Sequence, residues 1–177
     1  MLWVYPMKEC LQTEQKKFLG EELSHRLIFG CGMVSDDSEH AVMTLVAASN
    51  AEGDVARFQR NLAWHLRWWL LRLPAGCGLA TGRAIIKLWL GFPPSKSGVY
   101  SAGNGPAMRA PVLGVLLAES PELLRAYVRS STELTHTDPK ALVGAMAVAV
   151  AAAMVSEGKP IKVTDYKTRL LDCLQGC

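Results

Sequence analysis

The amino-acid sequence predicts an all-α fold, on three observations. Several stretches carry apolar residues at helical spacing, and Ser, Thr, Asp or Pro marks their starts. No stretch shows a sustained alternation of apolar and polar residues bounded by turns, which is the pattern of half-buried strands. The chain has 177 residues, of which 50% are hydrophobic and 20% charged, so one domain with a substantial core is expected.

The first 30 residues carry weak signals, with a short helix predicted over residues 18–27. The first strong helix is expected to be capped by Ser35 or Asp36, because apolar residues then follow at helical spacing: Ala41, Val42, Leu45, Val46 and Ala48. After a loop over residues 50–54, a long helix is predicted from Val55 to Leu73. Its apolar residues surround most of the helix: Leu62, Trp64, Leu66, Trp68, Trp69 and Leu70. This pattern favours burial over a base-stacking platform for nucleic acid.

A second group of helices is predicted from local start signals. Thr81 is expected to cap a helix over residues 82–90, and a loop over residues 95–105 follows. The next helix is predicted over residues 106–117, with Pro111 indicating either a kink or a later start. Ser120 and Asp138, each followed by proline, are expected to open helices, the first running through residue 130.

The segment Ala141–Val155 is rich in Ala, Gly and Met, so neighbouring helices can approach it closely and we expect it to be central. It is shorter than the roughly 20 apolar residues needed to span a bilayer, so no membrane partner is predicted. An amphipathic helix over residues 163–174 is expected to follow. No secretory signal is indicated over residues 1–10.

Charge and cysteine content exclude two further classes. The formal net charge of +3 comes from 19 basic and 16 acidic residues spread along the chain, so no basic stripe indicates a nucleic-acid partner. The five cysteines are odd in number and form no C-x-x-C pair: Cys10, Cys31, Cys77, Cys173 and Cys177. This fits neither a disulfide framework nor a zinc knuckle, and it predicts a cytoplasmic location.

A glycine-rich loop, residues 98–105, leads directly into the helix that begins near residue 106. Gly98, Gly103 and Gly105 are expected either to adopt positive φ or to let the backbone approach a ligand closely, and Pro106 suits the first helical position. Free N–H groups and the helix dipole at such a point favour a phosphate or another anion. By itself the segment is equally compatible with an ordinary helix-starting turn.

Three adjacent residues form an acidic motif. Ser35, Asp36 and Asp37 supply a hydroxyl and two carboxylates, which are the hard oxygen ligands that Mg²⁺ takes, although a solvated helix cap has the same composition. His40 lies one turn further on and raises a His-plus-carboxylate transition-metal site as an alternative. His136, just before a helix start, is by itself typical of a local hydrogen-bonding residue.

Three segments, in the right order, resemble motifs of the ADP-ribosylglycohydrolase family, which includes the dinitrogenase reductase activating glycohydrolases. Residues 34–38 are similar to its Thr-Asp-Asp-Thr metal motif, with Ser35 in place of threonine, residues 101–114 to its substrate loop, and residues 134–139 to its Thr-His-x-x-Pro segment. The resemblance implies an orthogonal multi-helix bundle and a two-ion Mg²⁺ site, with Mn²⁺ as an alternative. It also implies metal ligation by Ser35, Asp36 and Asp37, catalysis by Asp36 and Asp37, and substrate binding by Ser101, Gly103, Asn104, Gly105, Met108 and His136.

The implied reaction is hydrolysis of the glycosidic bond that joins ADP-ribose to a protein side chain or small molecule. In this interpretation the metals orient the ribose, the loop at Ser101–Gly105 holds the diphosphate, and a carboxylate-assisted water attacks the anomeric carbon.

Two family motifs have no counterpart in this sequence. They are an early Gly-Asp-x-x-Gly, sought in residues 1–25, and a late Gly-Asp-x-Asp-Thr that carries further metal ligands. We therefore expect a single domain over 1–177 that is incomplete at both ends, with family similarity over about residues 26–155. The alternatives are an impaired fragment that only binds an ADP-ribose-like nucleotide or a partner protein, and a structural helical module. Exposed apolar surface and self-association are also expected.

Overall fold

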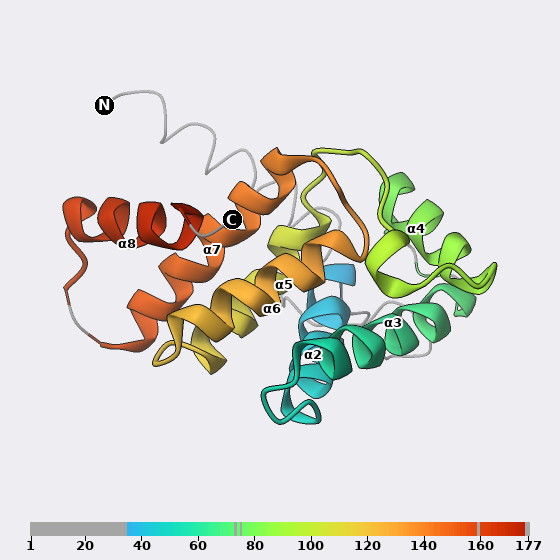
Figure 1. The fold of residues 1–177 in the computed structure, drawn as a ribbon, viewed down its shortest axis with the longest axis horizontal. Coiled ribbons are helices and arrows are strands. Elements are labelled where there is room, and N and C mark those ends of the chain that lie inside the picture. Colours follow the sequence, from blue (N-terminus) through green and yellow to red (C-terminus); the bar gives the residue numbers. More distant parts are fainter. Residues whose placement is uncertain (1–34, 73, 75, 159, 176–177) are drawn as a thin grey trace, which may run out of the picture. The chain divides into compact units, whose positions relative to one another are not determined.

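The computed structural model describes residues 35–72, 74, 76–158 and 160–175, which belong to the second of two compact units, Ser35–Cys177. The all-α prediction is confirmed: over these residues the chain forms helices and no strand (Figure 1). The elements are α2 (Asp36–Ser49), α3 (Val55–Leu71), α4 (Leu79–Trp89), a 3₁₀ turn (Pro94–Lys96), α5 (Gly105–Leu116), α6 (Pro121–Glu133), α7 (Pro139–Ser156) and α8 (Val163–Gln175). Sequence expectations for residues 1–34, including Cys10 and Cys31, and for Leu73, Ala75 and Cys177 lie outside the described residues.

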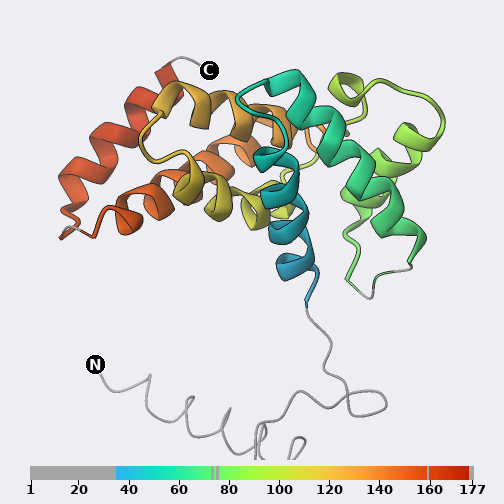
Figure 2. The same cartoon turned by 90° about the horizontal axis from the view of Figure 1, so that it is seen from below.

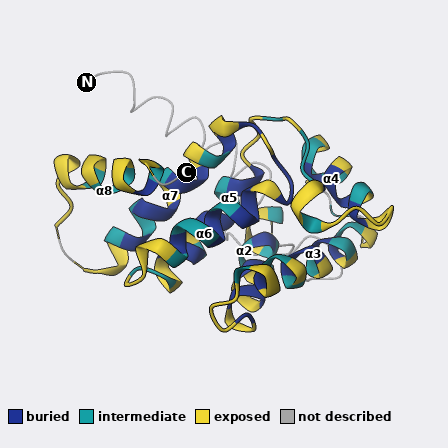
Figure 3. Ribbon diagram, viewed as in Figure 1, coloured by how far each residue is buried: buried dark blue, intermediate teal, exposed yellow. Residues whose placement is uncertain are grey.

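Helices α5 and α7 form the most extensive pair, and α6 and α8 also pack against α7. At this crossing a Cβ added to Gly114 would lie 2.2 Å from the Ala149 carbonyl oxygen, so only glycine allows the two backbones to come this close. Figure 3 shows buried residues concentrated along α5 and α7, whereas much of α4 and α8 is exposed. The expected central place of residues 141–155 is therefore confirmed.

Helix α7 is 18 residues long with a mean hydropathy of 1.7, which by length and composition would suffice to cross a membrane. Its contacts with α5, α6 and α8 are those of a core helix in the described unit. Figures 1 and 2 show it lying along α5 with α8 packed near one end.

Helix α3 begins where the Asp54 carboxylate accepts hydrogen bonds from the backbone N–H groups of Ala56 and Arg57, at 2.8 and 3.0 Å. Its buried face includes Phe58, which stacks on Tyr127 of α6 with ring centroids 4.4 Å apart. Trp69 is also buried. Together these contacts place α3 between α2, α4 and α6.

The predicted burial of the tryptophan helix is wrong for Trp64 and Trp68, which are 56% and 46% exposed. The two rings lie edge to face with each other, and Trp68 does the same with Trp89 of α4, at centroid distances of 5.5 and 5.8 Å. The buried residues of α3 are Phe58, Leu62, Ala63, Leu66 and Trp69, so Trp64 and Trp68 lie outside its buried face and make contacts at the surface. The expected exposed apolar surface is present here, while self-association stays a prediction.

One predicted helix start is wrong, and the late start, one of the two alternatives given for another helix, is excluded. Helix α4 begins at Leu79, so Thr81 lies in its first turn with its side chain buried, and Gly78 occupies the N-cap position. Helix α5 begins at Gly105 and continues past Pro111, so the later start does not occur. A proline four residues or more into a helix removes one internal hydrogen bond, and here the tertiary contacts of α5 offset that loss.

Candidate functional site

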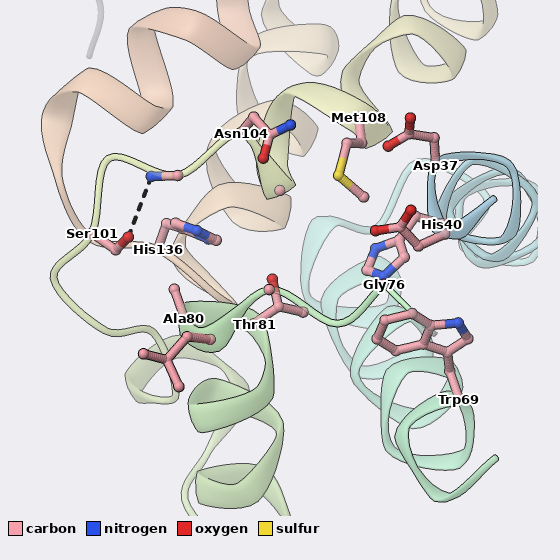
Figure 4. A pocket seen from close by; sticks show the side chains of 15 residues that line it. Asp37, His40, Trp69, Gly76, Ala80, Thr81, Ser101, Asn104, Met108 and His136 are labelled. Atoms are coloured by element: carbon pink, nitrogen blue, oxygen red, sulfur yellow. Dashed lines mark hydrogen bonds between the residues drawn. The ribbon is translucent and has the colours of Figure 1, made fainter. Parts of the chain in front are cut away.

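A pocket of about 420 Å³ lies between the start of α2, the start of α4 and the glycine-rich loop (Figure 4). This volume is in the usual range for small-molecule sites. Every site residue predicted from the sequence lines it except Ser35. The lining residues are Asp36, Asp37, His40, Trp69, Gly76, Gly78, Leu79, Ala80, Thr81, Ser101, Gly103, Asn104, Gly105, Met108 and His136.

The acidic side of the pocket is the first turn of α2. The Asp36 carboxylate fits against Gly76, where an added Cβ would lie 2.9 Å from Asp36 Cγ, and Asp37 is exposed. In the part of the chain that the structure describes, no cation forms an ion pair with either carboxylate. Ser35 is the N-cap residue, but its Oγ makes no capping bond and instead lies 3.5 Å from Ser38 Oγ. Two unpaired carboxylates therefore stand at a helix N-terminus, where the helix dipole favours negative charge.

His40 lies one turn further along α2 and lines the same side of the pocket. It is only 1% exposed, and neither ring nitrogen has a hydrogen-bond partner among the described residues. Its ring packs edge to face with Trp69 at 4.4 Å, and Trp69 Nε1 donates to Glu39 Oε2 at 2.7 Å. Burial, with a smaller effect of the positive charge on Arg109, lowers the His40 pKa to about 3, so the imidazole is neutral at pH 7.

The alternative of a transition-metal site built on His40 finds little support in this geometry. Within residues 35–72, 74, 76–158 and 160–175, no group of three or more His, Cys, Asp or Glu side chains is arranged to hold a metal ion. Transition-metal sites of this kind normally need at least three protein ligands.

The glycine-rich loop has glycines for space and not for positive φ. Gly98, Gly103 and Gly105 all lack positive φ, which among the described glycines occurs at Gly53, Gly91 and Gly158. A Cβ on Gly103 would lie 2.9 Å from His136 Nε2, and one on Gly105 would lie 3.0 Å from both His136 Cε1 and Thr81 Oγ1. Of the two predicted alternatives, positive φ does not occur at these glycines, and close approach to neighbouring side chains is what requires glycine at positions 103 and 105.

The loop presents its polar groups to the pocket. Ser101 Oγ accepts a hydrogen bond from the Gly103 N–H at 3.3 Å, as drawn in Figure 4. Asn104 is the N-cap residue of α5 but makes no side-chain capping bond, so its exposed side chain is free to meet a ligand. The first N–H groups of α5 lack partners within the helix, as at any helix start.

His136 faces the loop from the connection between α6 and α7. The residue is 2% exposed, and its ring Nδ1 lies 2.9 Å from Thr135 Oγ1. Its backbone N–H donates to the Thr132 carbonyl at 2.7 Å, and Val99 pairs with the residues on either side of it. Burial, with Arg109 as a smaller cause, lowers the His136 pKa to about 4. His136 is thus a neutral ring with a fixed position.

Arg109, on α5 beneath the loop, is completely buried. Its Nε donates to Ser131 Oγ at 3.1 Å, and its Nη2 donates to the Ser131 carbonyl at 2.9 Å and to Thr135 Oγ1 at 2.7 Å. No carboxylate forms an ion pair with it in the described unit, and Nη1 has no partner there. Burial lowers its pKa to about 10, which leaves it charged at pH 7.

Sequence reasoning assigned no role to several residues at this site. Arg109 carried a signal that was available, since it is the one charged residue in the otherwise apolar stretch 105–117. Thr81 and Trp69 carried no sequence signal of a role at this site, because only the tertiary packing of α3 and α4 brings them to the pocket.

The arrangement of the three motif segments around one pocket agrees with a family comparison. The family model described as ADP-ribosylglycohydrolase matches residues 7–175. The chain belongs to this family. The ADP-ribosylglycohydrolase match extends beyond the three motifs in both directions and includes every lining residue of the pocket.

A relative from Archaeoglobus fulgidus, described as an uncharacterized protein, is 34% identical over 123 residues. The aligned region covers 69% of this chain and 39% of that relative, so the chain spans about two fifths of the relative's length. Members of the ADP-ribosylglycohydrolase family act on ADP-ribosylated substrates and generally use divalent metal ions.

Proposed function

We propose that this chain supplies the substrate pocket of a hydrolase that cleaves the glycosidic bond between ADP-ribose and an acceptor. One observation carries the proposal. Asp36 and Asp37, the loop at residues 101–105 and His136 are far apart in sequence, yet all of them line one pocket. They come from the three segments by which the sequence resembles ADP-ribosylglycohydrolases.

The loop side of the pocket suits the diphosphate. Unpaired N–H groups at the start of α5 and the positive end of its dipole favour an anion there. Arg109 adds a full positive charge below the same helix turn, and no carboxylate pairs with it in the described unit. A buried charge in this position is stabilised when an anion binds nearby, because the low-dielectric surroundings screen the attraction weakly.

The acidic side suits a divalent cation in the kind of ligands it offers. Mg²⁺ is commonly held by one or two carboxylates together with water and substrate oxygens, and Asp36 and Asp37 both reach the pocket. When bound, such an ion supplies Lewis-acid chemistry toward the ribose hydroxyls and water. Mg²⁺ is our proposed ion, with Mn²⁺ as the alternative. Ser35 does not line the pocket, so its hydroxyl has less support as a ligand than the two carboxylates.

The proposed reaction is attack of water on the anomeric carbon of the ribose, with Asp36 or Asp37 accepting the proton from that water. Asp37 is exposed and Asp36 is half-buried, and neither has a cationic partner among the described residues, so either carboxylate is available as a base. The glycosidic bond breaks as the new bond to the water oxygen forms, and the acceptor, a protein side chain or a small molecule, leaves with a proton.

A second candidate function, nucleotide binding without turnover, is favoured by the composition of the acidic side. Only two carboxylates meet there among the described residues, and no group of three potential ligands forms. Fewer ligands hold an ion with less fixed geometry, which reduces the rate of a reaction that depends on it.

One experiment separates the two functions. ADP-ribose binding is measured by calorimetry, and release of ADP-ribose from a modified arginine or serine peptide is measured with excess Mg²⁺. We expect binding, with turnover several orders of magnitude slower than that of a family relative with a larger ligand set, because only two carboxylates meet on the acidic side among the described residues. Brisk turnover that is lost in Asp37→Ala would support hydrolysis by this chain alone. Absence of ADP-ribose binding at millimolar concentration would contradict both functions.

A further inference from the structure

The hydrogen bonds behind His136 determine which of its nitrogens carries the proton. Thr135 Oγ1 receives a hydrogen bond from Arg109 Nη2 at 2.7 Å. A guanidinium group only donates, so the Thr135 hydroxyl cannot direct its own proton toward Arg109. His136 Nδ1, at 2.9 Å, is the acceptor within reach of that hydroxyl among the described residues. Thr135 is 0% exposed, so water does not offer an alternative.

The opposite arrangement leaves a buried proton without a partner. If His136 donated from Nδ1, Thr135 Oγ1 would accept two hydrogen bonds and its own hydroxyl proton would face no acceptor. Buried donors without partners are strongly disfavoured in folded proteins. The hydroxyl therefore donates to Nδ1, and a neutral imidazole that accepts at Nδ1 carries its proton on Nε2.

The Nε2 end of the ring points toward the glycine-rich loop. A Cβ on Gly103 would lie 2.9 Å from this nitrogen, so the loop leaves room for the ring edge only because residue 103 is glycine. Within the described residues, no protein group makes a hydrogen bond with Nε2, and the ring lines the pocket. The donor is thus available to a ligand.

We propose that Arg109, acting through Thr135, holds His136 as the Nε2–H tautomer, so that the ring donates a hydrogen bond to an acceptor oxygen of ADP-ribose bound at the glycine-rich loop. The identity of the ligand rests on the proposed function, whereas the tautomer is a property of the ligand-free protein. Arg109 and Thr135 are positioning residues in this scheme. They touch His136 or its partner and not the ligand.

The tautomer is measured first, without ligand. In a two-bond ¹H–¹⁵N correlation spectrum of the histidine-labelled protein at pH 7.5, His136 is expected to show the Nε2–H pattern. In Thr135→Val the Nδ1 resonance should move toward the position of an unbonded ring nitrogen, and in Thr135→Ser it should stay near the wild-type position. An Nδ1–H pattern in the wild type overturns the inference, as does an unchanged Nδ1 resonance in Thr135→Val.

Affinity for ADP-ribose is measured by calorimetry on the same variants. Thr135→Val should bind about tenfold more weakly, and Thr135→Ser should bind within about twofold of the wild type. If Thr135→Val fails to fold, His136→Gln and His136→Asn replace it, because the Gln amide can place an N–H near the Nε2 position and the shorter Asn cannot. Gln should keep most of the affinity and Asn should lose about tenfold. Equal affinity of these two variants overturns the ligand contact.

The tautomer of His136 and the binding of ADP-ribose are tested independently of each other. A wild-type protein that shows the Nε2–H tautomer but binds no ADP-ribose contradicts the proposed function and the ligand contact, and leaves the Arg109–Thr135–His136 arrangement standing. A protein that binds ADP-ribose but shows the Nδ1–H tautomer overturns the inference and leaves the proposed function standing.

Discussion

The two sides of the pocket are built in different ways. On the loop side, His136 is held by Thr135, which is held by Arg109, and all three side chains are buried. On the acidic side, Asp36 and Asp37 have no cationic partner among the described residues, and the two nitrogens of His40 have no hydrogen-bond partner there.

This difference indicates which side depends on a ligand for completion. The loop side is arranged in advance, so an anion that binds there costs little reorganisation of the protein. The acidic side keeps two like charges next to each other with only the dipole of α2 to favour them, and a cation would stabilise it further. Substitutions of the buried loop-side groups should therefore reduce stability more than substitutions of the acidic-side carboxylates, whose main effect should be on cation binding.

The largest expected effect comes from removing the buried guanidinium. Arg109→Ala leaves a cavity and removes the donors to Ser131 and Thr135, so the free energy of unfolding should fall by about 3 to 5 kcal/mol. Asp37→Ala is the control on the other side, and because Asp37 is exposed its effect should stay within about 0.5 kcal/mol. Urea unfolding measures the free energy of unfolding of both variants. Similar losses in the two variants would remove the contrast between the sides.

The second prediction concerns pH. The His136 pKa is about 4 in the folded chain and near 6.5 when unfolded, so between these values the unfolded state binds more protons and stability falls as pH decreases. Between pH 7 and pH 5 this histidine should cost about 2 kcal/mol of stability. Because it lacks this titrating group, the His136→Gln variant should lose less stability than the wild type between pH 7 and pH 5. The free energy of unfolding is measured by urea unfolding at each pH. If it changes with pH equally in the wild type and the variant, the low pKa of His136 is refuted.

The third prediction tests the cation on the acidic side. Asp36→Ala and Asp37→Ala should each weaken Mg²⁺ or Mn²⁺ binding by about tenfold, or about 1.4 kcal/mol, because each removes one carboxylate ligand. Isothermal titration calorimetry measures the dissociation constants. If both variants bind the metal as the wild type does, the carboxylates are not its ligands.

The smallest expected effect separates two glycines of the same pocket. Gly103→Ala places a methyl group against His136 Nε2 and should weaken ADP-ribose binding by about fivefold, or about 1 kcal/mol. Gly78 also lines the pocket, but an added Cβ would meet nothing within 4 Å, so Gly78→Ala serves as the matched control. The readout is the rise in melting temperature with ADP-ribose. An equal rise in the two variants would mean that space at His136 is not limiting.

The sequence predicted those parts of the fold that depend on local signals. Ser120 and Asp138, each followed by proline, mark the starts of α6 and α7 at the residues where the structure has them. The burial of α3 was harder to predict, because apolar residues surround most of the helix and its periodicity does not show which face meets other helices. Trp64 and Trp68 are exposed for that reason.

The candidate site was predicted mainly through resemblance to a family. Asp36, Asp37, the glycine-rich loop and His136 line one pocket, but their chemical roles stay predictions. The spacing of residues did not reveal that positions 103 and 105 need glycine because the His136 ring lies against them. Sequence does not show which side chain will lie beside a loop. The contribution of Arg109 and Thr81 likewise depends on contacts between distant segments.

The contact between Gly114 and Ala149 has a mechanical consequence for the pocket. Gly114 lies roughly 13 Å along α5 from Gly105, given the rise of an α-helix. A rotation of α5 about its crossing with α7 would therefore move the glycine-rich loop, which lies at the far end of the helix. A methyl group added at residue 114 would clash with the Ala149 carbonyl oxygen. To relieve the clash α5 would have to rotate away from α7, and Asn104, at its N-terminus, would be displaced. We therefore expect a substitution of Gly114, which does not line the pocket, to change the width of the pocket.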